Sequence, residues 1–159
     1  MDFRVLGPVE VWSDGRRLDL GGRRRRGLLA LLLLHAGEAV PAERVIEELW
    51  ADEAATISAK TLHAHVSRLR AALGAGGDEA GAGRIVTTPG GYRVVLEAGE
   101  LDLRRFEELC AEGRRALAAG RPDRAAERLD AALAEWRGAP LSDLAYEPFA
   151  QGLGVDERP

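Results

Sequence analysis

The sequence lacks residues on which several classes of protein depend. Cys110 is the only cysteine among 159 residues, which excludes an internal disulfide and a metal site built from several thiolates. The leucine-rich run 28–34 is far too short to cross a bilayer. No secretion signal is present in the opening residues M-D-F-R-V-L-G. We therefore expect a cytoplasmic protein without a membrane partner, and an ordinary buried thiol at Cys110.

A net basic charge is also missing, since the chain carries −4 at pH 7. The charge is uneven, because residues 1–96 sum to +1 and residues 97–159 to −5. The first part is therefore free to present a local cationic surface. Because this charge is only weakly basic, one copy of the chain is expected to have modest affinity for a nucleic acid. Binding would then need a second copy or a partner.

A helix is predicted over 58–73, and the rest of the chain is arranged around it. Ser58 is a suitable N-cap, and Gly74 is a suitable stop. Helical spacing places four apolar residues on one narrow stripe that must be buried, namely Leu62, Val66, Leu69 and Leu73.

The opposite face of this helix has small residues at its centre, cationic or hydrogen-bonding residues around them, and no carboxylate. Small residues allow close approach to a surface, and Arg, Lys, Ser and Thr read base edges and phosphates. The face predicts a recognition helix, although a surface helix that is merely cationic fits the same pattern. Its residues are Lys60, Ala64, Ser67, Arg68 and Ala71, flanked by Thr61, His63 and Arg70.

The residues before this helix predict a small α+β unit. Short alternating runs at 3–6, 9–12 and 17–20 indicate a three-stranded antiparallel meander. A very apolar helix follows from the arginines at 23–26 to about 36–37, and an amphipathic helix follows Pro41 to Trp50. These arginines either contact phosphate at the helix N-terminus or only keep a very apolar helix soluble. We favour a phosphate contact for one or two of them.

The residues after the helix predict a loop, a wing and a helical pair. Residues 74–83 are expected to be a loop, and 84–88 with 92–96 a β-hairpin. Four residues of this hairpin have side chains suited to contacting the backbone phosphates of a nucleic acid, namely Thr87, Thr88, Tyr92 and Arg93. Tyr92 is equally suited to packing in the core. Two helices joined at Gly120-Arg121-Pro122 follow, and 142–152 can form another short one. The pair either packs on the first part or begins a longer helical domain.

No arrangement of residues supports catalysis, so the chain is not expected to be an enzyme or to hold a metal or cofactor. The glycines of 74–83 lack the following Lys-Ser/Thr of a phosphate-binding loop. His63 and His65 are two residues apart on a helix and point to different faces. The rival to a nucleic-acid binder is a helical adaptor whose cationic helix docks on an acidic protein surface.

Several motifs resemble a known family. The stretch T-L-H-A-H-V-S-R-L-R-A-A-L-G (61–74) is similar to the third helix of OmpR/PhoB-type winged helices. Further motifs resemble the Streptomyces antibiotic regulatory protein family: F-R-V-L-G-P-V-E-V (3–11), L-L-A-L-L-L-L-H-A-G (28–37), G-G-Y-R (90–93), L-D-L-R-R-F-E-E-L (101–109), W-R-G-A-P-L-S-D-L (136–144) and Y-E-P-F-A (146–150).

The resemblance implies a transcriptional activator. Residues 1–97 would be an α+β winged-helix DNA-binding domain, with an N-terminal antiparallel sheet, three helices and a β-hairpin wing. Residues 98–159 would be the first helices of an all-α activation domain resembling tetratricopeptide repeats, incomplete here. The implied DNA-contacting residues, together with the arginines favoured above, are Lys60, Thr61, Ala64, Ser67, Arg68, Arg70, Arg24, Arg25, Trp50, Thr88 and Tyr92.

The implied partners are double-stranded DNA with direct repeats near a promoter, a second protomer on that DNA, and RNA polymerase holoenzyme including its sigma factor. The polymerase-facing surfaces would be the connector 51–57 and the activation domain, and the targets would be secondary-metabolite genes. One departure is the short wing turn Pro89-Gly90-Gly91, which lacks the arginine often found there and argues against minor-groove reading.

Overall fold

The structure is a computed structural model that describes residues 1–75, 79–144 and 147–151. Its N-terminal part is a three-stranded antiparallel sheet in the order β1-β2-β3, which confirms the predicted meander. The strands are β1 (Asp2–Arg4), β2 (Glu10–Ser13) and β3 (Arg16–Arg17). The third strand starts earlier than predicted, because the turn at 14–15 pairs Ser13 directly with Arg16. It ends at Arg17, after which the Leu18 N–H donates one further hydrogen bond to the Val11 carbonyl oxygen.

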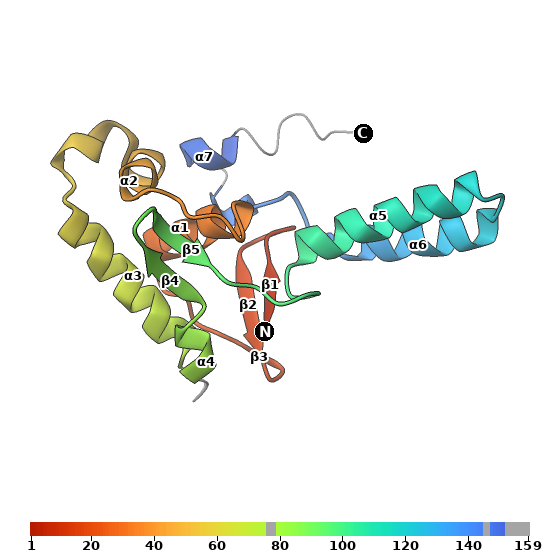
Figure 1. Ribbon diagram of the computed structural model, residues 1–159, viewed down its shortest axis with the longest axis horizontal. Coiled ribbons are helices and arrows are strands. Elements are labelled where there is room, and N and C mark those ends of the chain that lie inside the picture. Colours follow the sequence, from red (N-terminus) through yellow and green to blue (C-terminus); the bar gives the residue numbers. More distant parts are fainter. Residues whose placement is uncertain (76–78, 145–146, 152–159) are drawn as a thin grey trace.

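Three helices pack against one another beside this sheet (Figure 1). They are α1 (Arg23–Leu34), α2 (Ala42–Trp50) and α3 (Ala59–Leu73). Every residue from Gly27 to Leu33 is buried, so α1 is the centre of the core, as expected for a helix that is apolar nearly all round. Pro41 was predicted as the first residue of this second helix, but it is the N-cap of α2, one position before the helix begins. The connector from α2 to α3 is a 3-10 helix, η1 (Ala51–Thr56).

The hairpin predicted after α3 is present as β4 (Ile85–Thr88) and β5 (Gly91–Val94). Gly91 has φ +128°, and a side chain there would collide with the carbonyl oxygen of Val40. A short helix, α4 (Glu79–Ala82), stands within the stretch predicted as a loop, where glutamate and alanine favour a helical turn. Residues 76–78 of that predicted loop lie outside the described residues.

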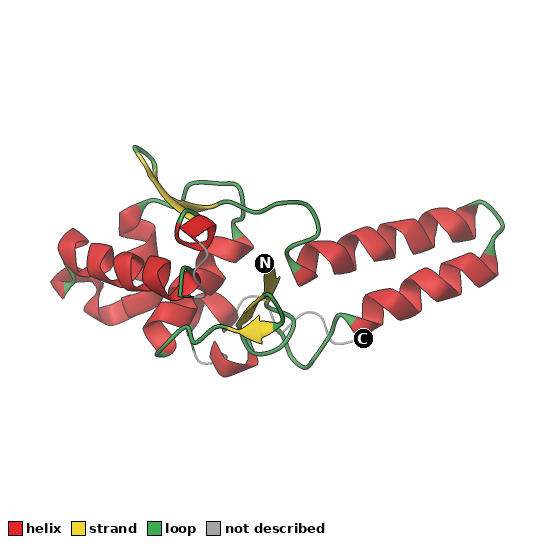
Figure 2. Ribbon diagram, turned by 90° about the horizontal axis from the view of Figure 1, so that it is seen from below, coloured by secondary structure: helices red, strands yellow, loops and turns green. Residues whose placement is uncertain are grey.

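The predicted helical pair is α5 (Asp102–Ala118) and α6 (Pro122–Ala134). Figures 1 and 2 show the two antiparallel helices extending away from the other helices, on the side opposite α3. The pair leaves apolar side chains in contact with solvent, since Leu117 is 62% exposed and Leu133 is 66% exposed. Cys110 is half-buried rather than buried, because it lies on this protruding pair. Among the described helices, none is long and apolar enough to span a membrane.

After α6 the chain returns to the first part of the molecule. It forms a short 3-10 helix, η2 (Ser142–Leu144), and a short helix, α7 (Pro148–Gln151), within the stretch predicted to add one more helix. Leu141, Leu144 and Ala150 are buried in the same apolar core as α1. The pair α5–α6 therefore projects, whereas the segment that follows it packs on the first part.

Two buried carboxylates join the junction after β5 to the rest of the body. The carboxylate of Asp102 is 1% exposed and accepts hydrogen bonds from the backbone N–H groups of Val5 and Leu6 at 2.9 Å each. The carboxylate of Glu100 pairs with both guanidinium ends of Arg84 and with the amino group of Met1. Burial raises the pKa of Asp102 despite these donors. Burial also raises the pKa of Glu100, but Arg84 and the backbone N–H of Glu97 outweigh burial and hold that pKa at about 2.

Candidate nucleic-acid interface

The predicted recognition helix is present, with both predicted ends. The Ser58 hydroxyl accepts a hydrogen bond from the Thr61 N–H at 3.1 Å, and Gly74 is the C-cap. All four residues of the predicted apolar stripe are 0% exposed: Leu62, Val66, Leu69 and Leu73. Burial of this stripe fixes which side of α3 faces outward.

The outward face of α3 carries cations and small polar side chains without a carboxylate. Lys60, Ser67 and Arg68 are exposed, and Ala64 between them is half-buried. Among the described residues, none forms a hydrogen bond or ion pair with the side chain of Lys60 or Arg68. This face can therefore donate hydrogen bonds to an outside acceptor without first breaking an internal one.

Arg70 is placed differently from Arg68, because its side chain is already engaged. Its Nε donates to the carbonyl oxygen of Ile85 at 2.9 Å, and its Nη2 donates to the Thr87 hydroxyl at 2.7 Å. Both acceptors lie on β4. The structure therefore directs Arg70 toward the wing, and the DNA contact that the sequence predicted for it stays a prediction.

A second cationic area lies where α1 and α2 meet α3, and it is formed by Trp50, His65, Arg24 and Arg25. The Trp50 ring is 8% exposed, meets the His65 ring edge-on at 5.3 Å between centroids, and lies 5.3 Å below the Arg24 guanidinium. Burial lowers the pKa of His65, and the charges of Arg68, Arg25 and Arg24 lower it further. Trp50 thus supports the cations instead of facing solvent itself. His65 was not predicted as part of the site, and a histidine alone gives no such signal in the sequence.

Three of the four arginines at the start of α1 are paired with carboxylates of the C-terminal segment. Arg23 Nε lies 2.5 Å from Glu147, and Arg26 Nη1 lies 2.7 Å from Asp143. Arg24 is 3.9 Å from the same Glu147. The two predicted explanations, phosphate contact and solubilisation, both omitted this internal pairing.

Two wing residues that were predicted to contact phosphate, Thr88 and Tyr92, already have contacts inside the protein. The Thr88 hydroxyl donates to the carbonyl oxygen of Gly91 at 3.2 Å and remains half-buried. Tyr92 is 7% exposed and belongs to the apolar core, which is the alternative weighed for it. The phosphate contact of Tyr92 therefore stays a prediction, which this burial does not favour.

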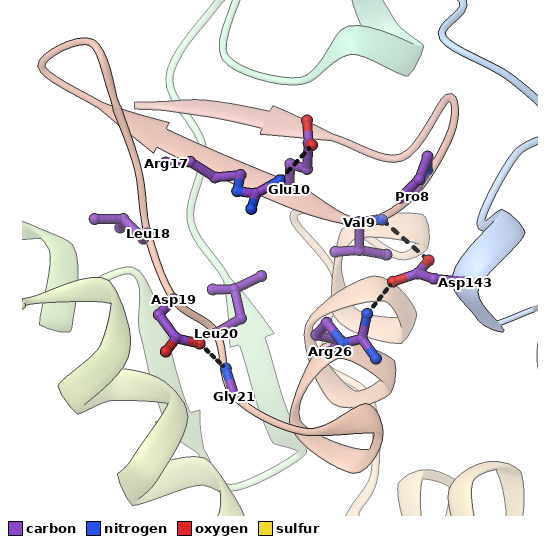
Figure 3. A pocket seen from close by; sticks show the side chains of 10 residues that line it. All are labelled: Pro8, Val9, Glu10, Arg17, Leu18, Asp19, Leu20, Gly21, Arg26 and Asp143. Carbon is purple, nitrogen blue, oxygen red and sulfur yellow. Dashed lines mark hydrogen bonds and ion pairs between the residues drawn. The ribbon is translucent and has the colours of Figure 1, made fainter.

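Figure 3 shows a polar groove of about 500 Å3 between β2, the segment after β3, the start of α1 and Asp143. Its carboxylates have partners: Asp143 accepts from the Val9 N–H at 3.1 Å, and Asp19 accepts from the Gly21 N–H at 2.9 Å. Within the described ranges, no cluster of three His, Cys, Asp or Glu side chains could hold a metal. The groove is a junction between segments.

The fold and the site together define a winged helix whose third helix presents a cationic outer face. Residues 15–94 match the family described as "Transcriptional regulatory protein, C terminal", and residues 101–155 match "Bacterial transcriptional activator domain". The chain therefore belongs to the Streptomyces antibiotic regulatory protein family, in which an OmpR/PhoB-type domain is joined to a bacterial transcriptional activator domain.

Similar proteins include the transcriptional regulatory protein EmbR of Mycobacterium tuberculosis, 36% identical over 99% of this chain and 41% of EmbR. The regulatory protein AfsR of Streptomyces coelicolor is 37% identical over 94% of this chain and 14% of AfsR. The solved structure of M. tuberculosis EmbR in complex with a low affinity phosphopeptide covers 95% of this chain, with TM-score 0.85 and 33% identity. This chain spans about two fifths of the length of EmbR. These relatives are named as regulators, and none is named as an enzyme.

Proposed function

We propose that the chain is a sequence-specific DNA-binding transcriptional activator that places α3 in the major groove. The observation that carries the proposal is the outward face of α3, where exposed cations have no carboxylate neighbour on the helix and no internal partner among the described residues. A helix of this kind fits the major groove, and arginine pairs well with the two acceptors of guanine.

The residues are proposed to divide the contacts by position. Arg68 and Ser67 meet base edges, and Lys60 and Thr61 meet bases or flanking phosphates near the start of α3. Ala64 has a small side chain at the centre of this face, so that the backbone of α3 can approach the DNA groove closely. Arg24 and Arg25, beside His65, are proposed phosphate contacts, with Thr88 at the wing.

The partners proposed for this activator follow from the family and from the weak charge of the first part. A second protomer on direct repeats near a promoter would double the phosphate contacts of a body that sums only to +1 over residues 1–96. We propose residues 1–97 as the DNA-binding unit, and residues 98–159 with the connector 51–57 as surfaces that recruit RNA polymerase through its sigma factor. Secondary-metabolite genes are the proposed targets.

The test is fluorescence-anisotropy binding, in graded salt, to a duplex with two direct repeats from the promoter nearest the gene. Wild type is compared with Arg68→Ala and with Arg114→Ala, which removes the same charge from an exposed position on the distant α5. We expect Arg68→Ala to lose about 1–3 kcal/mol on the specific site and Arg114→Ala to bind normally. Absence of salt-dependent duplex binding by wild type would contradict the proposal and favour the adaptor that docks on an acidic protein.

A further inference from the structure

Arg70 differs from the other cations of α3 because its guanidinium is fixed by two acceptors on one strand. Nε donates to the Ile85 carbonyl oxygen at 2.9 Å, and Nη2 donates to the Thr87 hydroxyl at 2.7 Å. Two donors in one rigid plane fix the orientation of the group as well as its distance. Both acceptors are uncharged. The pairing therefore does not neutralise Arg70, but it does determine where Arg70 points.

The acceptors lie on the edge of the wing that has no strand beside it. Strand β4 pairs with β5, and on that side the Arg84 carbonyl accepts from the Val95 N–H at 2.7 Å. Successive carbonyls along a strand alternate in direction, so the Ile85 carbonyl points away from β5. Ile85 is 2% exposed, and a buried carbonyl needs a donor. Arg70 supplies that donor from α3.

The other edge of the wing is attached independently. Val40 and Tyr92 exchange two backbone hydrogen bonds, of 2.8 and 3.0 Å, which join β5 to the segment before α2. The wing is thus held to the body along β5 and to α3 along β4. Figure 2 shows the hairpin standing out from the helices. Loss of the attachment along β4 would leave the angle between wing and α3 free to vary.

We propose that Arg70 is a positioning residue, which sets the wing against α3 so that both reach one duplex and which leaves base recognition to Arg68. This inference rests on the proposed function of α3. It predicts that the geometry of the Arg70 guanidinium matters and that a positive charge alone does not suffice. Lysine is the discriminating substitution, because it keeps the charge but cannot place two coplanar donors on β4.

The experiment compares wild type, Arg70→Lys, Arg70→Ala and Thr87→Val. Arg68→Ala, on the same helix, is the matched control for the hydrogen-exchange measurement. Hydrogen exchange of the β4 amides is measured in the free protein, and hydroxyl-radical footprints are measured on the direct-repeat duplex. Thermal melting of each variant checks that it folds. Thr87→Val removes one acceptor while keeping Arg70, so a folding defect of Arg70→Ala does not decide the result.

We expect roughly tenfold faster exchange of the β4 amides in both Arg70 variants, a smaller increase in Thr87→Val, and none in Arg68→Ala. The Arg70 variants should also lose protection of the DNA backbone next to the wing while keeping that next to α3. Unchanged exchange, or a wild-type footprint with Arg70→Lys, would overturn the positioning role. A wild-type protein that gives no footprint would instead contradict the proposed function itself.

Discussion

The winged-helix body has a covered side, where segments within residues 100–150 pack on it, and an exposed side, which is the outward face of α3. The two sides differ in whether their polar groups have internal partners. On one side, residues 100–150 supply carboxylates that meet the cations and backbone N–H groups of the first part, at Glu100, Asp102, Asp143 and Glu147. On the other side, the outward face of α3 has cations and no such carboxylate. Part of the acidic excess of the second part therefore acts as an internal partner of the first part, and it leaves α3 available.

This contrast shows why a run of arginines is a poor guide to a binding site. Four consecutive arginines open α1, yet Arg23 and Arg26 form ion pairs with residues more than a hundred positions later. Arg68 has only Arg70 close to it in the sequence, yet no described residue forms a hydrogen bond or ion pair with its side chain. Availability of a charge depends on what the folded chain places next to it.

The largest predicted effect lies on the covered side. Asp102→Ala leaves the N–H groups of Val5 and Leu6 without their acceptor in a buried place. We expect a loss of about 3 kcal/mol in the free energy of unfolding, measured by urea denaturation. The control is Asp130→Ala, an exposed position on α6. Equal stability of the two variants would show that the junction is not fixed by this carboxylate.

Acid should weaken the same side through Glu100. Its pKa is about 2 in the folded protein, against an ordinary value of 4.5. A lowered carboxyl pKa stabilises the fold fully above the ordinary value, and that stabilisation is lost as pH falls from about 4.5 toward 2. The full loss is on the order of 3 kcal/mol. Denaturant unfolding across this range should show it in wild type, and Glu100→Gln should lack this component of the pH dependence.

Breaking the ion pair between α1 and Glu147, the residue before α7, should separate stability from recognition. Glu147 is 4% exposed and lies 2.5 Å from Arg23. Glu147→Gln is expected to lower the free energy of unfolding by about 1–2 kcal/mol, because the hydrogen bond loses its charge. The preference for the specific duplex over a scrambled one should not change, as anisotropy can check. Loss of that preference would mean that the covered side takes part in base recognition.

The smallest predicted effect concerns the exposed side and separates a phosphate contact from a base contact. Lys60 is exposed at the start of α3 and has no internal partner among the described residues. Lys60→Ala should weaken specific and scrambled duplexes alike and reduce the slope of log affinity against log salt by about 1. A selective loss on the specific duplex, with the slope unchanged, would assign Lys60 to a base instead of a phosphate.

Local signals in the sequence predicted the elements well. The apolar stripe of α3, its caps at Ser58 and Gly74, and the hairpin of the wing depend on neighbouring residues and can be inferred from spacing. The wing turn is one residue shorter than predicted, because Gly91 already pairs with Thr88. The partners of the arginines could not be predicted. Because α1 is apolar nearly all round, its sequence does not indicate which side faces the core, and Glu147 is 124 positions from Arg23.

The orientation of α3 was predicted for the same reason. Spacing on α3 separated its outward face from its buried stripe, but Arg70 depends on how β4 approaches the helix. The burial of Tyr92 depends on its pairing with Val40, which lies on a distant segment. Contacts between elements decide these positions, and no spacing within one element encodes them.

The most direct test of the account is a cycle between Arg68 and single bases of the DNA site. Guanines in the direct repeats are replaced one at a time by 7-deazaguanine, which lacks the N7 acceptor, and each duplex is titrated with wild type and Arg68→Ala. The account predicts one guanine at which wild type loses roughly tenfold in affinity while Arg68→Ala loses nothing further. Equal losses for both proteins at every guanine would contradict base recognition by Arg68.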